Sequence, residues 1–221
     1  MTDTGHYAIY RIEKISTPGS LAASSQHMAR TRPTPNADPK RRDRNRVLVG
    51  SEDPEADVRA LLPELGSRTD DGRLRRRANS VLAIEVLLTA SPEWWQSSSA
   101  EQRREWLDRS VEYLAEAYGR ENIAHLRLHQ DERTPHLTGF IVPLDDGCLN
   151  ARRWTGGRAA LAAQQTAYAA ALTDLGLRRG VEGSPAQHER VQRHYGALAR
   201  PVAEIDVERP PRLLLDPAAW A

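Results

Sequence analysis

Ten residues in the middle of the chain hold most of the side chains that could do chemistry. Segment 129–138 reads His-Gln-Asp-Glu-Arg-Thr-Pro-His-Leu-Thr, so His129 and His136 flank the acidic pair Asp131 and Glu132. Imidazole and carboxylate groups are common protein ligands of divalent metal ions. A lone histidine here would be read as a polar residue at a turn. Two histidines beside two acids predict a metal site.

The runs on either side of this segment would position it. Residues 123–128 alternate in the manner of a strand, and residues 137–144 are rich in strand-forming side chains. Together they predict a hairpin over 122–144 with a short acidic turn. Such a hairpin would bring His129 and His136 face to face on neighbouring strands.

Periodicity elsewhere predicts further strands and helices. The run Ser99 to Tyr118 has apolar residues at helical spacing, and Ser99 with Gln102 forms a capping box. Strands are expected at 6–15 (a central strand) and 79–90, and helices at 20–29, 54–65, 99–118, 156–176 and 184–198. Three prolines exclude regular structure from a basic arm at 31–43. The fold class is therefore α+β, with a central, mainly antiparallel β-sheet flanked by helices.

Charge is unevenly distributed along the 221 residues. The formal net charge is only +1, but segment 30–46 holds seven basic residues against two acidic ones, six of the seven being arginine. Arginine makes bidentate phosphate contacts, so this segment is expected to bind a nucleic-acid backbone. Cys148 is the only cysteine, which excludes an internal disulfide and a thiolate metal site. No apolar run reaches the roughly 18 residues of a membrane helix, and a signal peptide is lacking, so a cytoplasmic protein is expected.

Several of these motifs, in this order, resemble a known family. The segment His129-x-Asp-Glu-x-Thr-Pro-His136, followed by Gly147-x-Leu-Asn-Ala-Arg152, resembles motif III of the MobV/Pre plasmid mobilisation relaxases, members of the HUH endonuclease superfamily. The resemblance extends to Tyr7-Ala-Ile-x-Arg-x-x-Lys14, Gln26-His27-x-x-Arg30, Thr34-Pro-Asn-Ala-Asp-Pro39 with Asn45, and Leu175-Gly-Leu-x-Arg-Gly-Val-x-Gly-Ser184. It covers roughly residues 7 to 198.

The resemblance implies a metal-dependent DNA endonuclease that nicks one strand at an origin of transfer during plasmid mobilisation. Such an enzyme keeps the 5′ phosphate covalently attached and leaves a free 3′ hydroxyl. The family's nucleophilic histidine corresponds to His27, which would form a phosphohistidine. Glu132 corresponds to the family's acidic residue and is the expected partner that orients His27. Arg46 stands where some relatives carry a tyrosine.

One position departs from the superfamily pattern. The HUH motif has a second histidine two residues after the first, and that position is Thr138 here. We therefore expect the metal ligands to be His129, His136 and Thr138, with Asp131, Glu132, water or His188 as alternatives for the third place. His125 is not expected to replace the missing histidine easily, because four residues along an extended strand place it about 13 Å from His129. An oxygen in the third place favours Mn²⁺ or Mg²⁺.

The expected organisation has two parts. Residues 1–200 would form the DNA-nicking relaxase domain, and 201–221 a proline-rich tail. Single-stranded or hairpin DNA would lie along the phosphate-binding residues Arg30, Arg32, Arg42, Arg44 and Arg46. Dimerisation is expected through a C-terminal extension that relatives carry beyond this chain. Two alternatives remain: a catalytically degenerate DNA-binding module that keeps the HUH fold, and a rolling-circle replication initiator.

Overall fold

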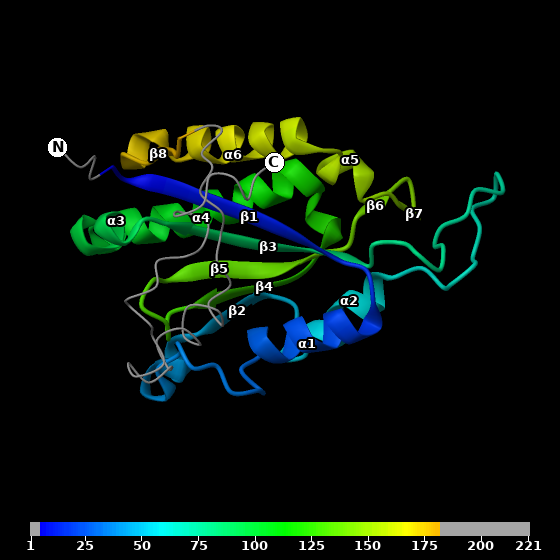
Figure 1. The fold of residues 1–221 in the computed structure, drawn as a ribbon, viewed down its shortest axis with the longest axis horizontal. Helices are drawn as coiled ribbons and strands as arrows, with labels where there is room; N and C mark the ends of the chain where they lie inside the picture. Colours follow the sequence, from blue (N-terminus) through cyan, green and yellow to red (C-terminus); the bar gives the residue numbers. More distant parts are fainter. Residues whose placement is uncertain (1–4, 182–221) are drawn as a thin grey trace, which may run out of the picture. The chain divides into compact units, whose positions relative to one another are not determined.

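The computed structural model describes residues 5–181, and its centre is a six-stranded sheet in the order β2-β4-β5-β3-β1-β8 (Figure 1). The strands are β1 (Tyr7–Ile15), β2 (Arg46–Val49), β3 (Ala83–Ala90), β4 (Ile123–His129), β5 (His136–Ile141) and β8 (Arg178–Arg179). Every neighbouring pair is antiparallel except β1 with β8. A separate two-stranded ribbon joins β6 (Leu144–Asp145) to β7 (Cys148–Leu149). The expected α+β class with a mainly antiparallel sheet is confirmed.

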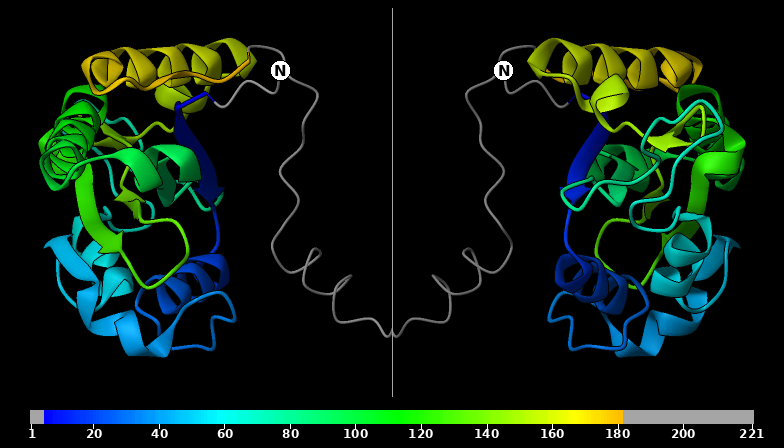
Figure 2. Two further views of the ribbon diagram at one scale, coloured as in Figure 1. Left: turned by 90° about the vertical axis from the view of Figure 1, so that its left-hand side faces the viewer. Right: turned by 90° about the vertical axis from the view of Figure 1, so that its right-hand side faces the viewer.

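Helices cover both faces of the sheet (Figures 1 and 2). On one face lie α3 (Pro92–Ser97), α4 (Ala100–Tyr118), α5 (Arg152–Thr155) and α6 (Arg158–Ala171); on the other lie α1 (Pro18–Met28) and α2 (Pro54–Leu61). Three short 3₁₀ helices complete the described part: η1 (Pro39–Arg44), η2 (Arg120–Asn122) and η3 (Thr173–Leu175).

The two faces of the central strands differ in polarity. Successive side chains of a strand point to opposite faces, and on β4 this sends Leu126 and Leu128 into the main hydrophobic core under α4 and α6. The alternate positions carry Arg127 and His129 toward the side of α1 and α2, where the apolar cluster is smaller. The large core thus fixes the sheet from one side and leaves its other face available for polar groups.

The hairpin β4–β5 has the register that the site requires. His129 pairs directly with His136, and Leu126 pairs with Gly139. A Cβ atom at Gly139 would lie 2.1 Å from the carbonyl oxygen of His125, where the pairing of β4 shifts by a residue. Only glycine permits this close approach. The hairpin expected over 122–144 is therefore confirmed, with a turn at 130–135.

Several expected boundaries differ from the observed ones. Helix α2 ends at Leu61, not at residue 65, because Pro63 holds the preceding Leu62 in an extended conformation. Pro39 begins the 3₁₀ helix η1 inside the arm expected to be irregular, and the Asp38 side chain accepts a hydrogen bond from the Lys40 amide. Strand β1 is next to the sheet's edge, with only the two-residue β8 beyond it.

The sequence-based prediction for α4 is confirmed in detail. Ser99 is its N-cap, and the reciprocal bonds with Gln102 are both present. The helix expected at 184–198, the boundary at 200 and the tail lie outside the described residues. Within the described part, no helix combines the length and apolar character needed to cross a bilayer.

Candidate metal and nucleophile site

The β4–β5 hairpin brings its two terminal histidines into contact. Nδ1 of His129 lies 3.1 Å from Nε2 of His136, and the rings meet edge to face at a centroid distance of 5.0 Å. Both residues are buried. Burial lowers the pKa of His129 to about 2, with the neighbouring His136 as the next cause, and burial also lowers the pKa of His136. Both imidazoles are therefore neutral and can act as ligands at neutral pH.

Backbone carbonyls decide which nitrogen of each ring is free. Nε2 of His129 lies 2.9 Å from the carbonyl oxygen of Met28, and Nδ1 of His136 lies 3.1 Å from that of Thr134. A carbonyl can only accept, so each of these nitrogens carries the proton of its neutral ring. The lone pairs of the other two nitrogens then face each other. This pattern, with outer N–H groups bonded to carbonyls, is typical of metal-binding histidines.

Glu132 supplies a third donor to this pair. Its Oε1 lies 3.9 Å from Nε2 of His136, and ligand atoms of His129, Glu132 and His136 all lie within 4.8 Å of one another. Two neutral nitrogens and a carboxylate form a compact donor set of total charge −1. The set fits a divalent cation, and its oxygen makes it suitable for the harder metals Mn²⁺ and Mg²⁺.

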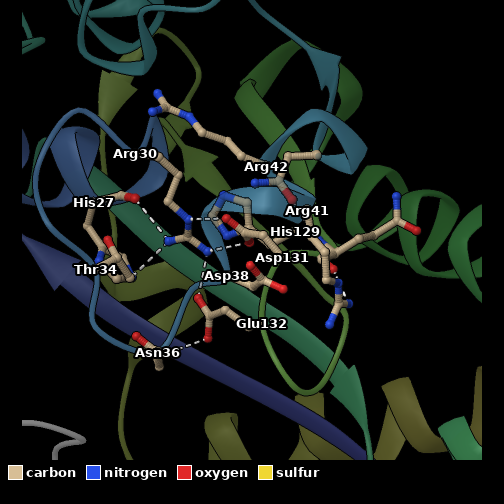
Figure 3. A network of polar contacts seen from close by, with 12 residues as sticks. His27, Arg30, Thr34, Asn36, Asp38, Arg41, Arg42, His129, Asp131 and Glu132 are labelled. Carbon is tan, nitrogen blue, oxygen red and sulfur yellow. Dashed lines mark hydrogen bonds and ion pairs between the residues drawn. The ribbon is translucent and has the colours of Figure 1, made fainter.

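Arg30 holds the carboxylates of the turn in place (Figure 3). Its guanidinium forms a bidentate pair with Asp131, both distances being 2.9 Å, and its Nη2 also donates to Oε1 of Glu132 at 2.6 Å. These groups are well buried, with 5% of the Arg30 side chain and 2% of that of Asp131 exposed. Burial acts to raise the pKa of Asp131, but the hydrogen bonds and the charge of Arg30 outweigh it and lower the pKa to about 2.

The backbone of Arg30 has an unusual conformation for a non-glycine residue. Its φ of 59° lies in the left-handed region just after the C-terminus of α1. A side chain there costs about 1–2 kcal/mol relative to the right-handed form. Glycine would avoid this cost. With this backbone conformation, the Arg30 side chain runs from the end of α1 to the carboxylates of the β4–β5 turn, and its ion pairs there offset the cost.

His27 approaches the same cluster from the last turn of α1. Its Nε2 lies 3.5 Å from Nη1 of Arg30, and its carbonyl oxygen accepts a bond from the same group at 3.1 Å. Burial lowers the pKa of His27, and the positive charge of Arg30 lowers it further. The imidazole is therefore neutral at neutral pH, and its ring is half-buried rather than enclosed.

The expected direct bond between His27 and Glu132 is not formed. Among the described residues, Glu132 is bonded instead to Arg30 and, through Oε2, to the side-chain amide of Asn36. Arg30 thus links His27 to Glu132. Sequence reasoning could not place this arginine, although the spacing His27-x-x-Arg30 puts both at the end of one helix.

Thr138 lies on the same face of β5 as His136, but its hydroxyl has another partner. It donates to the carbonyl oxygen of Val86 on the neighbouring strand at 3.0 Å, and the residue is buried. The third donor beside the histidines is Glu132, one of the alternatives weighed for that place. A role of Thr138 as a metal ligand stays a prediction.

The segment after α1 secures the turn. The backbone amide of Asp38 donates to the carbonyl oxygen of Asp131 at 2.7 Å, and the Asn45 side chain accepts from the Gln130 amide at 2.7 Å. Arg41 also donates to the Gln130 carbonyl. Sequence reasoning treated this segment only as a basic arm, although Asn36 and Asn45 are within the motif that carries the family resemblance.

The arginines expected to bind phosphate divide into two groups. Arg30 is buried in ion pairs, so its donors are already used. Arg32, Arg42, Arg44 and Arg46 are exposed on the surface around the site. These four keep their charge available to an external anion, whereas Arg30 acts inside the protein.

The chain is similar in sequence to a family of known proteins. The model of the family described as plasmid recombination enzyme (Mob_Pre) matches residues 4–196. A "65 kDa protein" of Zymomonas mobilis subsp. mobilis is 45% identical over 221 residues, covering 98% of this chain and 37% of that protein. Plasmid recombination enzyme type 3 of Staphylococcus aureus is 24% identical, covering 85% of this chain and 47% of its own. The chain thus spans less than half the length of these curated relatives.

Solved structures give the same result. Crystal structures of the MobM relaxase domain, Mn-bound and in complex with plasmid pMV158 oriT DNA of 22 nucleotides, superpose with a TM-score of 0.74. The sequence identity is 27%, and the match covers 86% of this chain and 99% of that one. A further complex of that domain, with 26 nucleotides of the same DNA, has a TM-score of 0.65 at 26% identity.

Proposed function

This chain belongs to the plasmid recombination enzyme family, and on that premise we propose that it is a DNA relaxase. It would nick one strand at an origin of transfer with a divalent metal, Mn²⁺ or Mg²⁺, and hold the cut strand covalently. The family match spans most of the chain, and its solved structural relatives are Mn-bound relaxase domains in complex with oriT DNA.

One observation carries the proposal. A neutral, half-buried imidazole at the end of α1 faces the arginine that binds Glu132, the third member of the donor set on the β4–β5 hairpin. The nucleophile candidate and the metal donors are about a hundred residues apart in sequence. Their convergence in one site fits phosphoryl transfer, which needs an attacking group beside a centre that neutralises phosphate charge.

The reaction follows from these positions. A nitrogen of His27 attacks the phosphorus of the scissile phosphodiester, an N–P bond forms, and the bond from phosphorus to the 3′ oxygen breaks. The 3′ oxygen takes a proton from solvent and becomes a free 3′ hydroxyl, while the 5′ phosphate stays on His27. When bound, the divalent ion would act as a Lewis acid on a phosphate oxygen. The reverse reaction rejoins the strand, so phosphodiester energy is conserved.

Arg30 would keep His27 in its reactive form. A protonated imidazole has no lone pair for the attack, and burial, followed by the charge of the adjacent guanidinium, lowers the pKa of His27. The same arginine orients Glu132 and Asp131, so one side chain both favours the neutral nucleophile and holds the turn in position. Arg30 is therefore a positioning residue.

DNA would reach this site over the exposed arginines. Arg32, Arg42, Arg44 and Arg46 are exposed on the segment after α1, which bonds to the β4–β5 turn, and phosphate contacts of this kind supply affinity without reading sequence. Dimerisation through segments that longer relatives carry, and a cytoplasmic location, stay predictions.

The direct test is nicking of supercoiled plasmid that carries the DNA flanking this gene. With Mn²⁺ we expect relaxed circles and a covalent protein–DNA adduct; chelation of the metal should abolish both. His27→Ala should lose the adduct, while Gln26→Ala, an exposed neighbour on the same helix, should retain it. An adduct that persists in His27→Ala would rule out this nucleophile.

Metal binding separates this function from that of a degenerate DNA-binding module. Calorimetric titration should detect Mn²⁺ uptake by the wild-type chain and none by Glu132→Gln. Absence of uptake at micromolar metal in the wild type, with DNA binding retained, would favour the binding module. The donor position filled by Glu132 argues for an intact site.

A further inference from the structure

A cleft of about 440 Å³ lies at the same end of the sheet as the metal donors but under α3 and the start of α4. Figure 1 places α3, the beginning of α4, the β4–β5 turn and η1 together at its left-hand side. The volume falls within the range of about 300–1,000 Å³ typical of small-ligand sites. We call it the α3–α4 cleft, lined among others by Trp95, Arg103, Arg104, Gln130 and Arg133.

The charge of the cleft has one sign. Five arginines line it and none of its lining residues, all from the described part of the chain, is acidic; besides the three just named they are Arg41 and Arg46. Arg46, Arg104 and Arg133 are exposed. Their guanidinium groups have no hydrogen bond or ion pair with any residue that the structure describes. Like charges gathered around a concave surface repel one another, and an anion would relieve this repulsion.

The position of two of these arginines strengthens the argument. Arg103 and Arg104 lie near the N-terminus of α4, where the helix dipole disfavours cations. Arg103 is nonetheless held in place, since it donates to the Ser98 hydroxyl at 3.0 Å and to the Trp95 carbonyl at 2.6 Å. Cations placed against the local electrostatic preference are consistent with binding an external anion.

The indole ring of Trp95 lies beside the arginines in the lining of the cleft. Trp95 is half-buried, and its indole N–H donates to the Thr89 hydroxyl at 3.2 Å. Trp94 and Trp106 meet its ring edge to face, at centroid distances of 5.0 and 4.9 Å. The indole is thus fixed in orientation. A fixed aromatic surface next to several arginines suits a flat base attached to a phosphate.

The β4–β5 turn connects this cleft to the metal donors. Glu132 points toward Arg30 and the histidines, while the next residue, Arg133, lines the cleft. Gln130 and Pro135, at either end of the turn, line it too. One strand of DNA passing the metal donors would therefore need to round only this turn to reach the cleft.

We propose that the α3–α4 cleft binds one nucleotide of the DNA strand, with its base against Trp95 and its phosphates on Arg104 and Arg133. The proposal rests on the proposed relaxase function. A free mononucleotide shares the same chemistry, but Arg32, Arg42 and Arg44 are exposed outside the cleft as well, which favours a continuous strand.

The test measures binding of a fluorescent single-stranded oligonucleotide from the flanking DNA, in chelator so that no cutting occurs. For the double variant Arg104→Ala/Arg133→Ala we expect about 10-fold weaker binding. The slope of log affinity against log salt should become shallower by about 1.4, because two phosphate contacts are lost. The matched control is Arg120→Ala/Arg158→Ala, which removes the same charge from two exposed residues of η2 and α6 outside the cleft and should keep the wild-type slope.

Trp95 gives an independent readout. Trp95→Ala should weaken binding without changing the salt slope, and Trp95→Phe should restore part of the affinity; thermal unfolding checks that both fold. If the arginine double variant matches its control, the cleft proposal is overturned. Displacement of the oligonucleotide from the cleft by micromolar deoxymononucleotide would overturn the strand assignment in favour of a free nucleotide.

Plasmid nicking, measured in parallel, separates the two proposals. If wild-type protein nicks DNA and the Arg104→Ala/Arg133→Ala variant binds the oligonucleotide as its control does, only the cleft proposal is overturned. Wild-type protein that neither nicks nor binds the oligonucleotide would remove the relaxase function and the cleft proposal with it.

Discussion

His125 and His129 lie four residues apart on the same face of β4, and both side chains are fully enclosed, yet their surroundings differ in kind. Nδ1 of His125 lies 2.8 Å from a carboxylate oxygen of Asp57, which Ser51 also binds through its amide and hydroxyl. Nε2 of His125 has no hydrogen-bond partner in the described part of the chain. This histidine ties α2 to the sheet.

His129 has a different kind of neighbour. Its free lone pair faces that of His136, and the Glu132 carboxylate lies close by. Nε2 of His125 has no comparable donor beside it among residues 5–181. The comparison teaches that residue type, strand position and burial do not make a metal site. Convergence of unprotonated donor atoms does, and on this strand it occurs only where the hairpin turns.

The greatest loss of nicking activity is expected from removing a metal donor at the hairpin turn, where the donor atoms converge. His136→Ala should lower nicking at least about 1,000-fold, beyond the about 10–100-fold that loss of an outer hydrogen-bond partner costs. The matched control is His125→Gln, which removes the histidine that bonds to Asp57 and is not a metal donor. Under conditions in which this variant is folded, its nicking rate should be within about threefold of wild type. Equal losses in both variants would erase the distinction between the two regions.

The largest expected effect on stability lies in the ion pairs beside the metal donors. Arg30→Ala leaves Asp131 and Glu132 without their cation, and breaking a buried pair costs about 3–5 kcal/mol. Chemical denaturation measures the change. Arg32→Ala, an exposed arginine two residues on, should change the free energy of unfolding by less than about 0.5 kcal/mol. A comparable loss in both variants would contradict the assigned role of Arg30.

The His125–Asp57 region should respond to pH through stability. Burial lowers the pKa of His125 from its ordinary value of 6.5. As the pH falls below about 6.5, this histidine therefore takes up protons more readily in the unfolded chain than in the folded one. For Asp57, burial acts to raise the pKa, but bonds from Ser51 and His125 outweigh it and lower the pKa. Both shifts make the fold less stable as pH falls, from about 6.5 through the acidic range.

His125→Gln should therefore weaken this pH dependence, as well as lowering stability at pH 7 by about 1–3 kcal/mol. Denaturation midpoints at several pH values between 7 and 4 measure the slope. A slope identical to that of wild type would mean that His125 contributes nothing to the pH dependence.

The smallest expected effect belongs to Thr138. Thr138→Val removes the bond to the Val86 carbonyl and should cost about 1 kcal/mol of stability, with Mn²⁺ affinity unchanged. Calorimetric titration decides the point. A Mn²⁺ affinity at least 10-fold lower would establish Thr138 as a ligand after all.

Much of this molecule could be predicted from local pattern. The hairpin, the pairing of His129 with His136 and the capping of α4 by Ser99 each depend on residues close in sequence, where alternation and capping rules apply directly. The end of α2 was misplaced because the effect of Pro63 on Leu62 outweighed the cap expected at Gly66.

Local pattern and the order of the motifs are enough to predict the hairpin, its two histidines and the family resemblance. The place of Arg30 between His27 and Glu132, and that of Glu132 beside the histidines, depend on contacts between distant segments. The bond from His125, four residues from His129, to Asp57 of α2 depends on such contacts too. Hydrogen bonds and ion pairs between segments far apart in the chain form only where the folded sheet brings those segments together. Local spacing carries no information about which segments those are.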